Sequence, residues 1–345
     1  MNSMFISAIE SAIDYNNCFQ RMCPYKCVLI FYIYVRTVNV VTIVILSRGK
    51  CGLSEGVTRY LVAMVAADQL VVLFDLVLSK IPVTYWPIEF VNWSGRVRVC
   101  NIHAVLFYAA TDCSVWFTVT FTFDRFVAIC FQELKRRFCT GRAAALVLGT
   151  VTVLICLKNI CWYFMLDELF SSLNRSLICL TSDRLFSHSQ LATFLLIHFL
   201  LTPIFPFVLI LLLNSLTIRH VFVASRARRR LRGSRVGETA ADPEMKNRRK
   251  SLLLLLVMSG NFILLWALLT VCSVWESLIF YIYSIPPESL RELGYMLQLL
   301  SCCTNTALYA VVQARFREQL KETVKSPLRL MAKCTRRCQD CINAR

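Results

Sequence analysis

The sequence predicts an all-α membrane protein, folded as a bundle of seven transmembrane helices. Two observations lead to this fold class. Of the 345 residues, 57% are apolar and only 17% are charged, which is too apolar for a disordered chain or an ordinary soluble domain. The apolar residues also come in long blocks, without the spacing of a half-buried helix or strand, and such blocks are typical of membrane spans.

Seven of these blocks are long enough to cross a bilayer, which takes about 20 helical residues. The predicted spans are residues 28–47, 57–79, 101–130, 143–165, 190–218, 251–275 and 293–313. They divide the chain into an N-terminal segment, a seven-span domain that contains one long connection, and a tail. These parts are residues 1–27, residues 28–313 with the connection at about 219–250, and residues 314–345.

The charge distribution predicts the orientation of the chain. Lys and Arg number 38 against 21 Asp and Glu, a formal charge of +17. On a soluble protein this excess would favour a nucleic-acid partner, whereas the apolar content here favours membrane lipid and no nucleic acid. Cytoplasmic loops keep an excess of Lys and Arg, and 27 of the 38 follow the first, third, fifth and seventh spans. We therefore expect a multi-pass protein of the plasma membrane with an extracellular N-terminus.

Two Asn-x-Ser sequons agree with this orientation. Asn92 and Asn174 lie in connections that it places outside, where N-glycosylation occurs. Cys18, Cys23 and Cys27 also lie on that side, but the connectivity of a bridge among them cannot be read from the sequence.

A short motif at the end of the third span carries a family resemblance. Residues 123–126 read Phe-Asp-Arg-Phe, and the chain resembles the rhodopsin-like (class A) G-protein-coupled receptors. In that family the acid holds the arginine at rest, and in the active state the arginine meets the G protein. The resemblance assigns these roles to Asp124 and Arg125 and implies a heterotrimeric G protein as partner. Taken alone, a charged pair at a membrane boundary is an ordinary interfacial anchor.

The sixth and seventh spans match further family positions. Phe262 and Trp266 form the Phe-x-x-x-Trp element beneath the ligand, and Asn305 and Tyr309 lie where the family has Asn-Pro-x-x-Tyr. The resemblance implies that these residues take part in activation.

The sequence departs from the family at three positions. Leu268 and Thr306 replace prolines of the sixth and seventh helices, and Asn214 replaces a tyrosine of the fifth. Because proline kinks a helix, we expect the sixth span to pivot less sharply than in the family.

The resemblance also implies a sodium site inside the bundle. A carboxylate within a span requires a partner, and Asp68 matches the family's sodium-binding aspartate. The full matching set of oxygen ligands is Asp68, Ser114, Ser301 and Asn305. Such hard oxygen ligands suit a cation. The alternative is a hydrogen-bonded network that lets the helices shift, and either would support a switch.

Other family features concern the two ends of the bundle. Cys100 and Cys179 occupy the positions of the family's outer disulfide, and Phe316 stands where the short amphipathic eighth helix is anchored. The tail cysteines are either palmitoylated or free thiols; they are Cys334, Cys338 and Cys341.

The outer half of the predicted bundle offers an aromatic ligand site with a few ionisable groups. Phe107 stands where amine receptors of the family carry aspartate, which argues against a biogenic amine, and the mixture suits a small zwitterion or a peptide end. The candidate residues are His103, Phe107, Tyr108, Thr111, Asp112, His198, Trp266 and Glu276. For each aromatic ring the alternative role is helix packing.

Several short stretches resemble one branch of the family more closely. They include Ser114 to Val119, Leu265 to Ala267 and Asn305 to Ala307, and they are similar to the orphan receptors thought to respond to tryptophan and phenylalanine. The resemblance thus implies a receptor for an extracellular small molecule or peptide, such as an aromatic amino acid, that activates heterotrimeric G proteins.

Three other functions are alternatives to this one. A seven-helix decoy that signals weakly is favoured by the departures at Leu268, Thr306 and Asn214. A transporter is less favoured, because no internal repeat is found. An enzyme is not expected, because the four histidines lie far apart and no acidic cluster has metal or acid/base spacing.

Overall fold

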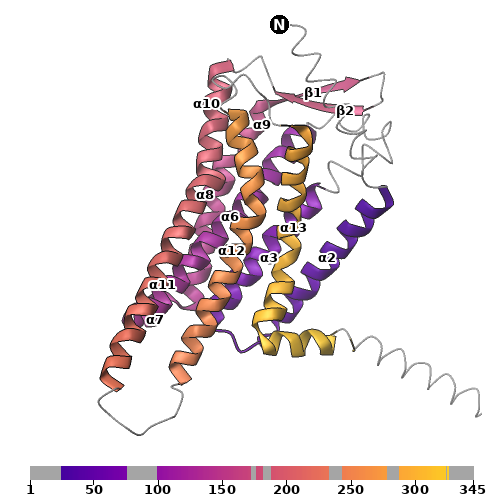
Figure 1. Ribbon diagram of the computed structural model, residues 1–345. Coiled ribbons are helices and arrows are strands. Elements are labelled where there is room, and N and C mark those ends of the chain that lie inside the picture. The colour runs from indigo at the N-terminus through magenta and orange to yellow at the C-terminus, as the bar shows by residue number, and fades with distance from the viewer. Residues whose placement is uncertain are drawn as a thin grey trace, which may run out of the picture.

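The computed structural model describes residues 25–75, 99–171, 176–181, 188–232, 243–277, 287–323 and 325. Long helices dominate these residues, and one two-stranded hairpin lies across an end of the bundle (Figure 1). In chain order the elements are α2 (Tyr25–Ser47), α3 (Glu55–Phe74), α6 (Val99–Cys130), α7 (Gln132–Phe138), α8 (Gly141–Asn159), α9 (Trp162–Met165), β1 (Leu166–Ser171), β2 (Ser176–Thr181), α10 (His188–Phe199), η2 (Leu200–Ile204), α11 (Phe205–Arg232), α12 (Pro243–Ser277) and α13 (Glu288–Val312).

The predicted bundle of membrane helices is confirmed. Six helical segments of the described chain are long and apolar enough to cross a membrane, and α2 contributes a shorter apolar stretch, Tyr32–Ser47. The fifth span consists of α10, the π-helical η2 and α11 in succession. Side chains that point away from the bundle are largely apolar, as lipid contact requires: Leu146, Leu264 and Val311 are more than 70% exposed.

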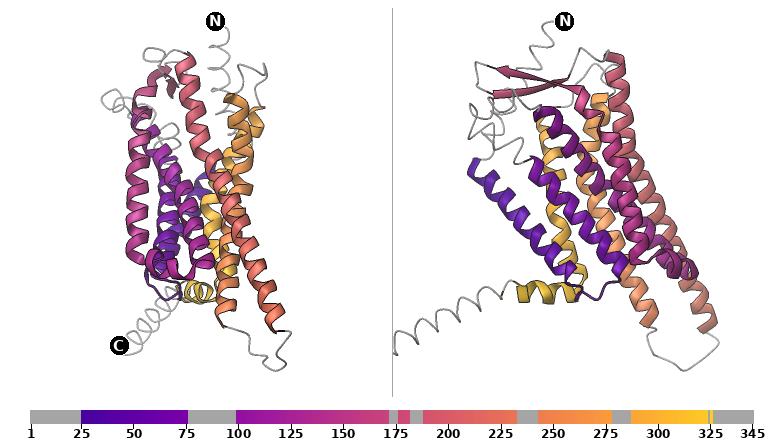
Figure 2. Two further views of the ribbon diagram at one scale, coloured as in Figure 1. Left: turned by 90° about the vertical axis from the view of Figure 1, so that its left-hand side faces the viewer. Right: turned by 180° about the vertical axis from the view of Figure 1, so that it is seen from behind.

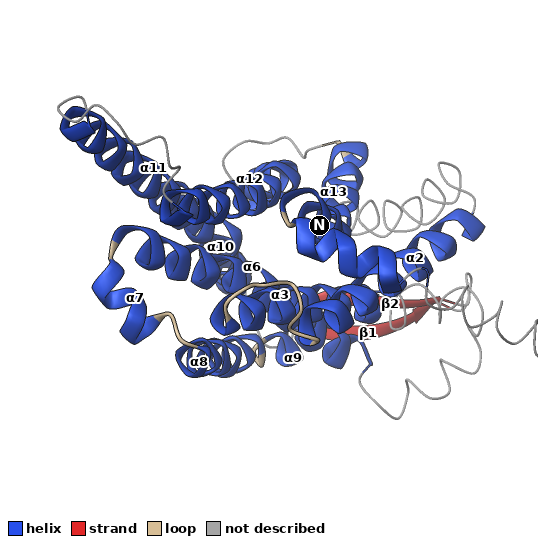
Figure 3. Cartoon of the chain, turned by 90° about the horizontal axis from the view of Figure 1, so that it is seen from below, coloured by secondary structure: helices blue, strands red, loops and turns tan. Residues whose placement is uncertain are grey.

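Helix α6 occupies the centre of the bundle. It packs against α3, α8, α11 and α12, and the view along the bundle shows it surrounded by the other helices (Figure 3). Val115 and Phe121 of α6 are fully buried. Polar residues that α6 carries on its inward faces therefore meet partners from several helices at once.

Helices α11 and α12 extend beyond the apolar blocks that predict them. The connection expected at about 219–250 is helical up to Arg232 and again from Pro243, and both helices project past the rest of the bundle (Figure 2). Arg, Lys and Glu have good helix propensity, so a helix continues after the apolar run has ended. The apolar run sets the length of the span and not the length of the helix.

The hairpin was not predicted from the sequence. Strands β1 and β2 are antiparallel, with Leu166 paired to Thr181, Ser171 to Ser176 and Glu168 to Cys179. Each strand has only six residues, which is too short a pattern to separate from a loop between two long apolar blocks. The hairpin marks the end of the bundle called here the hairpin end.

At the opposite end, called the α7 end, a short helix follows α13. Residues 314–323 are helical and lie across the bundle (Figure 1). Phe316 is fully buried, with its ring centroid 5.8 Å from that of Tyr309. The expected eighth helix is thereby confirmed and is attached to the end of α13 by this contact.

Close approach of α12 and α13 depends on a glycine. A Cβ atom on Gly294 would lie 3.1 Å from the backbone N and Cα of Leu269, whereas a Cβ on Gly149 of α8 would meet nothing within 4 Å.

Alanine is preferred to glycine in a helix by ~1 kcal/mol. We expect Gly149→Ala to raise the melting temperature of the purified protein slightly and Gly294→Ala to lower it. Equal shifts for the two variants would contradict the close packing of α12 on α13.

Candidate functional site

A buried ion pair closes α6 at the α7 end. Arg125 donates from Nε to Oδ2 of Asp124 at 3.0 Å, and its Nη2 donates to the same oxygen. Both residues are less than 9% exposed, and the Arg125 Cζ lies 5.9 Å from the ring centroid of Phe121. A charge buried without a partner would be strongly destabilising. In this arrangement the arginine charge is neutralised by its neighbour.

A cysteine contacts the same turn from the segment between α7 and α8. Cys139 donates from Sγ to the backbone oxygen of Asp124 at 3.5 Å. Burial, followed by the nearby Asp124 carboxylate, raises the pKa of the Cys139 thiol to about 11. The thiol therefore remains protonated at neutral pH and acts as a donor.

Asp68 lies at the centre of the bundle and joins three helices. Its Oδ1 accepts a hydrogen bond from Ser114 of α6 at 2.6 Å, and its Oδ2 accepts one from Asn305 of α13 at 2.6 Å. The carboxylate is 2% exposed. Two strong hydrogen bonds offset part of the cost of burying it.

A small cavity adjoins Asp68. It measures about 10 Å³, which is room for about one water molecule or one small cation. All four residues of the expected sodium set line it, together with Met64, Thr118, Met258, Asn261 and Phe262. The carboxylate and the hydroxyl and amide oxygens fit the preferences of a hard cation.

Ser301 connects this cavity to Trp266. The Trp266 Nε1 donates to Ser301 Oγ at 3.1 Å, and Ser301 Oγ donates onward to the Gln298 carbonyl at 2.7 Å. Phe262, one turn from Trp266 on α12, lies 5.4 Å from the Trp266 ring centroid and also lines the cavity. A change in the Trp266 side chain therefore alters the surroundings of Asp68.

Each of the three departures from the family pattern has a structural consequence, and two of them add a hydrogen bond between helices. Thr306 shares a 2.6 Å hydrogen bond with Thr42 of α2, and Asn214 donates to Ser259 of α12 at 2.7 Å. Each replacement thus contributes a bond between helices. At the third position, Leu268 leaves α12 as one uninterrupted helix.

Two buried polar residues complete the inner core. Tyr309 is 1% exposed and Asn39 is fully buried. Among the residues that the structure describes, no protein group hydrogen-bonds to the Tyr309 hydroxyl or to either polar atom of the Asn39 side chain. Buried polar atoms of this kind are commonly satisfied by ordered water.

Besides Trp266, four of the eight expected ligand residues form two groups at the hairpin end. His103, Phe107 and Tyr108 form a run along α6, with 5.7 Å between successive ring centroids. Glu276 of α12 forms a 3.4 Å ion pair with Arg291 of α13, and both side chains are about one-third exposed. The aromatic run belongs to α6, whereas the ion pair joins α12 to α13. The hairpin end therefore carries both aromatic and ionisable side chains.

The remaining three expected residues are buried. His198 is 6% exposed, Thr111 is 6% exposed and Asp112 is fully buried. Tyr108 stacks on Trp162 of α9, with 4.0 Å between ring centroids, and Trp162 was not expected from the sequence. Its only sequence signal is its position four residues after Lys158, close to the end of the fourth apolar block.

Several expected sites fall on parts of the chain that the structure does not describe. Cys100 is disulfide-bonded, and the side chain of Cys179 lies outside the described residues, as do Asn92 and Asn174. The same holds for the cysteines at the two ends of the chain, namely Cys18, Cys23, the side chain of Cys27, Cys334, Cys338 and Cys341.

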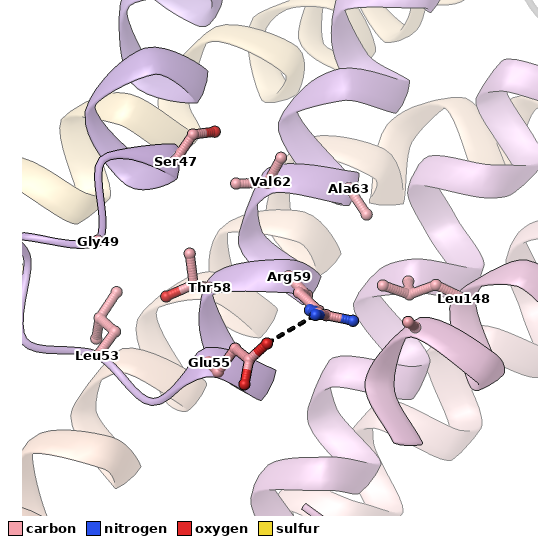
Figure 4. Close-up of a pocket in the computed structure, with 10 residues that line it drawn as sticks. Ser47, Gly49, Leu53, Glu55, Thr58, Arg59, Val62, Ala63 and Leu148 are labelled. Atoms are coloured by element: carbon pink, nitrogen blue, oxygen red, sulfur yellow. Dashed lines mark hydrogen bonds and ion pairs between the residues drawn. The ribbon is translucent and has the colours of Figure 1, made fainter. Parts of the chain in front are cut away.

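A larger groove opens at the α7 end. It has a volume of about 600 Å³ between α2, α3 and α8, and the Glu55–Arg59 ion pair, 2.6 Å long, lies on its wall (Figure 4). Val62, Ala63 and Leu148 form its apolar part. Neither Asp68 nor any residue of α6 lines this groove.

Comparison with known proteins agrees with this architecture. A FMRFamide receptor from Drosophila melanogaster is 26% identical over 202 residues, which cover 56% of this chain and 36% of the relative. The chain thus aligns with about a third of that relative's length. The family model described as 7 transmembrane receptor (rhodopsin family) matches residues 38–309, most of the chain and all but the beginning of the seven-helix bundle. The chain belongs to the rhodopsin family of seven-transmembrane receptors.

Proposed function

We propose that this receptor binds an extracellular ligand and in response activates heterotrimeric G proteins through Arg125. The observation that carries the proposal is the buried Asp124–Arg125 pair at the α7 end, where α11 and α12 project beyond the bundle (Figure 2). A pair of this kind has two available states. Arg125 is either held by Asp124 or released to an acceptor on a partner.

The contacts around Trp266 connect the proposed ligand site with α6, the helix that carries Arg125. A ligand seated among α6, the fifth span, α12 and α13 would press on the aromatic residues and on Trp266, whose Nε1 is bonded to Ser301 beside Asp68. Asp68 in turn holds α6 through Ser114 and α13 through Asn305. The ligand shifts the equilibrium only by its difference in affinity for the two arrangements. No covalent chemistry is required of the receptor.

A sodium ion beside Asp68 would stabilise the resting arrangement. Asp68, Ser114, Ser301 and Asn305 would hold it, and the ion would supply a positive charge to a carboxylate that lies in a low-dielectric interior. Because the ion would contact residues from three helices, it would oppose their relative movement.

Two ligand classes are proposed in order. A peptide is favoured, because the relative from Drosophila is named as a receptor for one, FMRFamide. The aromatic run on α6 keeps tryptophan and phenylalanine as the second class. A decoy would bind the ligand without activating a G protein, and replacing Arg125 distinguishes a decoy from a signalling receptor.

Replacing Arg125 tests G-protein coupling. Arg125→Ala should abolish nucleotide exchange in a panel covering all G-protein classes while surface expression is kept, because the released guanidinium is lost. Arg36→Ala, which removes an arginine from α2, serves as the matched control and should signal like the wild type. FMRFamide, tryptophan and phenylalanine are tested as agonists. Equal signals from wild type and Arg125→Ala would favour the decoy.

Replacing Asp68 tests the sodium site without a known agonist. Sodium at ten times its Kd should stabilise the purified wild type by ~1.4 kcal/mol relative to the same concentration of choline. Asp68→Asn keeps the side-chain shape but lacks the charge, so its melting temperature should not respond to sodium. Asp75→Asn, which alters a carboxylate bonded to Tyr32, should keep the response. A sodium response that survives in Asp68→Asn would place the ion elsewhere.

We also propose that the hairpin end is extracellular and that the receptor resides in the plasma membrane. Asn92 and Asn174 should then carry glycans, so peptide-N-glycosidase should increase the gel mobility of the wild type. Each single Asn→Gln variant should lose part of that shift, and the double variant all of it. A mobility that never responds to the enzyme would contradict this orientation.

A further inference from the structure

Three segments meet near the hairpin end in two layers of side chains, which we call the three-helix junction. Each segment contributes one residue to an aromatic layer and one to an ionic layer. The two residues are always four apart in the sequence, and for the pair on α6 this is one helical turn on the same face. The pairs are Tyr108 and Asp112 on α6, Trp162 and Lys158 on α9 and α8, and His198 and Thr202 on α10 and η2.

The aromatic layer is a closed triangle of rings. Ring centroids are 4.0 Å apart for Tyr108 and Trp162, 5.3 Å for Tyr108 and His198, and 5.2 Å for Trp162 and His198. Trp162 and His198 are both buried. The Tyr108–Trp162 pair is stacked and the other two are edge-to-face, and aromatic rings favour both kinds of arrangement.

The ionic layer is directional. Lys158 Nζ lies 2.7 Å from Asp112 Oδ2 and donates to Thr202 Oγ1 at 3.3 Å. Asn159 donates from Nδ2 to the same Asp112 oxygen at 2.7 Å. Asp112 is fully buried, so it needs these partners, and the Lys158 ammonium bonds both α6 and η2.

Thr202 lies in the bend of the fifth span. Its backbone is extended, with φ −153° and ψ 104°, inside a segment that is otherwise helical, and Pro203 follows it. Proline has no N–H to donate, so the backbone here makes fewer helical bonds of its own. The Lys158–Thr202 bond is therefore a side-chain tie at a point where the helix is interrupted.

We propose that Lys158 is a positioning residue of the ligand site. It ties the bend of the fifth span to Asp112 and so fixes His198 against Tyr108, the two residues of the aromatic layer expected to face the ligand. Lys158 itself touches no ligand. The inference rests on the proposed receptor function only for the assignment of these residues to a ligand site, and the tie between helices can be measured without any agonist.

Hydrogen–deuterium exchange of the purified full-length receptor tests the tie. Thr202→Val removes one bond to a charged group and leaves Asp112 paired with Lys158, so this variant should fold. Amides of residues 193–204 should exchange about tenfold faster, the factor that corresponds to one such bond. Thr152→Val is the matched control, because Thr152 of α8 donates to the Leu148 carbonyl at 2.8 Å and belongs to neither layer of the junction. Exchange at 193–204 that is equal in both variants overturns the proposal.

Variants of the charges provide a second, independent measurement. Lys158→Met should accelerate the same amides more than Thr202→Val does, because Asp112 loses its counter-charge. Lys158→Arg keeps a cation of similar reach and should restore most of the protection. If Lys158→Arg behaves like Lys158→Met, or if Lys158→Met leaves 193–204 unchanged, Lys158 does not position the bend.

A signalling measurement then separates positioning from simple stability. With FMRFamide as the agonist, Thr202→Val should raise the half-maximal concentration about tenfold and leave the maximal response and the surface expression as in the wild type. A loss of maximal response with unchanged half-maximal concentration would overturn the positioning role. If the wild type itself gives no signal with any agonist, the proposed function fails, while the exchange data still decide the tie.

Discussion

Charged and polar side chains inside this bundle must be satisfied by other protein groups, because lipid offers them nothing. Asp68, Asp112, Asp124 and Arg125 are all buried, and each is bonded to another side chain. Along α6 they define three levels: Asp112, then Ser114 with its partner Asp68 two residues further on, and the Asp124–Arg125 pair at the α7 end. At the first two levels the partners come from other helices.

The three levels differ in how firmly they hold. The Asp112 level uses a full ion pair and two further polar side chains. The Asp68 level uses two neutral donors and adjoins a cavity of about 10 Å³. The Asp124 level consists of neighbours in sequence, so its bond holds no second helix. Rearrangement therefore requires least at the Asp124 level and most at the Asp112 level.

Features that depend on one segment could be predicted, and features that depend on how segments rotate could not. The lengths of apolar runs were enough to predict the spans, and the Asp124–Arg125 motif lies on a single turn. The Lys158–Asp112 pair was not predicted, because it depends on which face of α8 turns toward α6. Trp162 and the Thr42–Thr306 bond escaped prediction for the same reason. The β1–β2 hairpin is too short to leave a clear periodic pattern.

The uninterrupted course of α12 has a mechanical consequence. From Trp266 to the start of the helix at Pro243 the chain rises ~35 Å. A rigid rod of this length that tilts about Trp266 by ~5° would displace its far end by ~3 Å, from the same rise per residue. In a kinked helix, bending at the kink would absorb part of the tilt, so the far end would move less. Because Leu268 leaves α12 unbroken beside Trp266, a small tilt of the part near the ligand is carried without a hinge to the far end, where the displacement is larger.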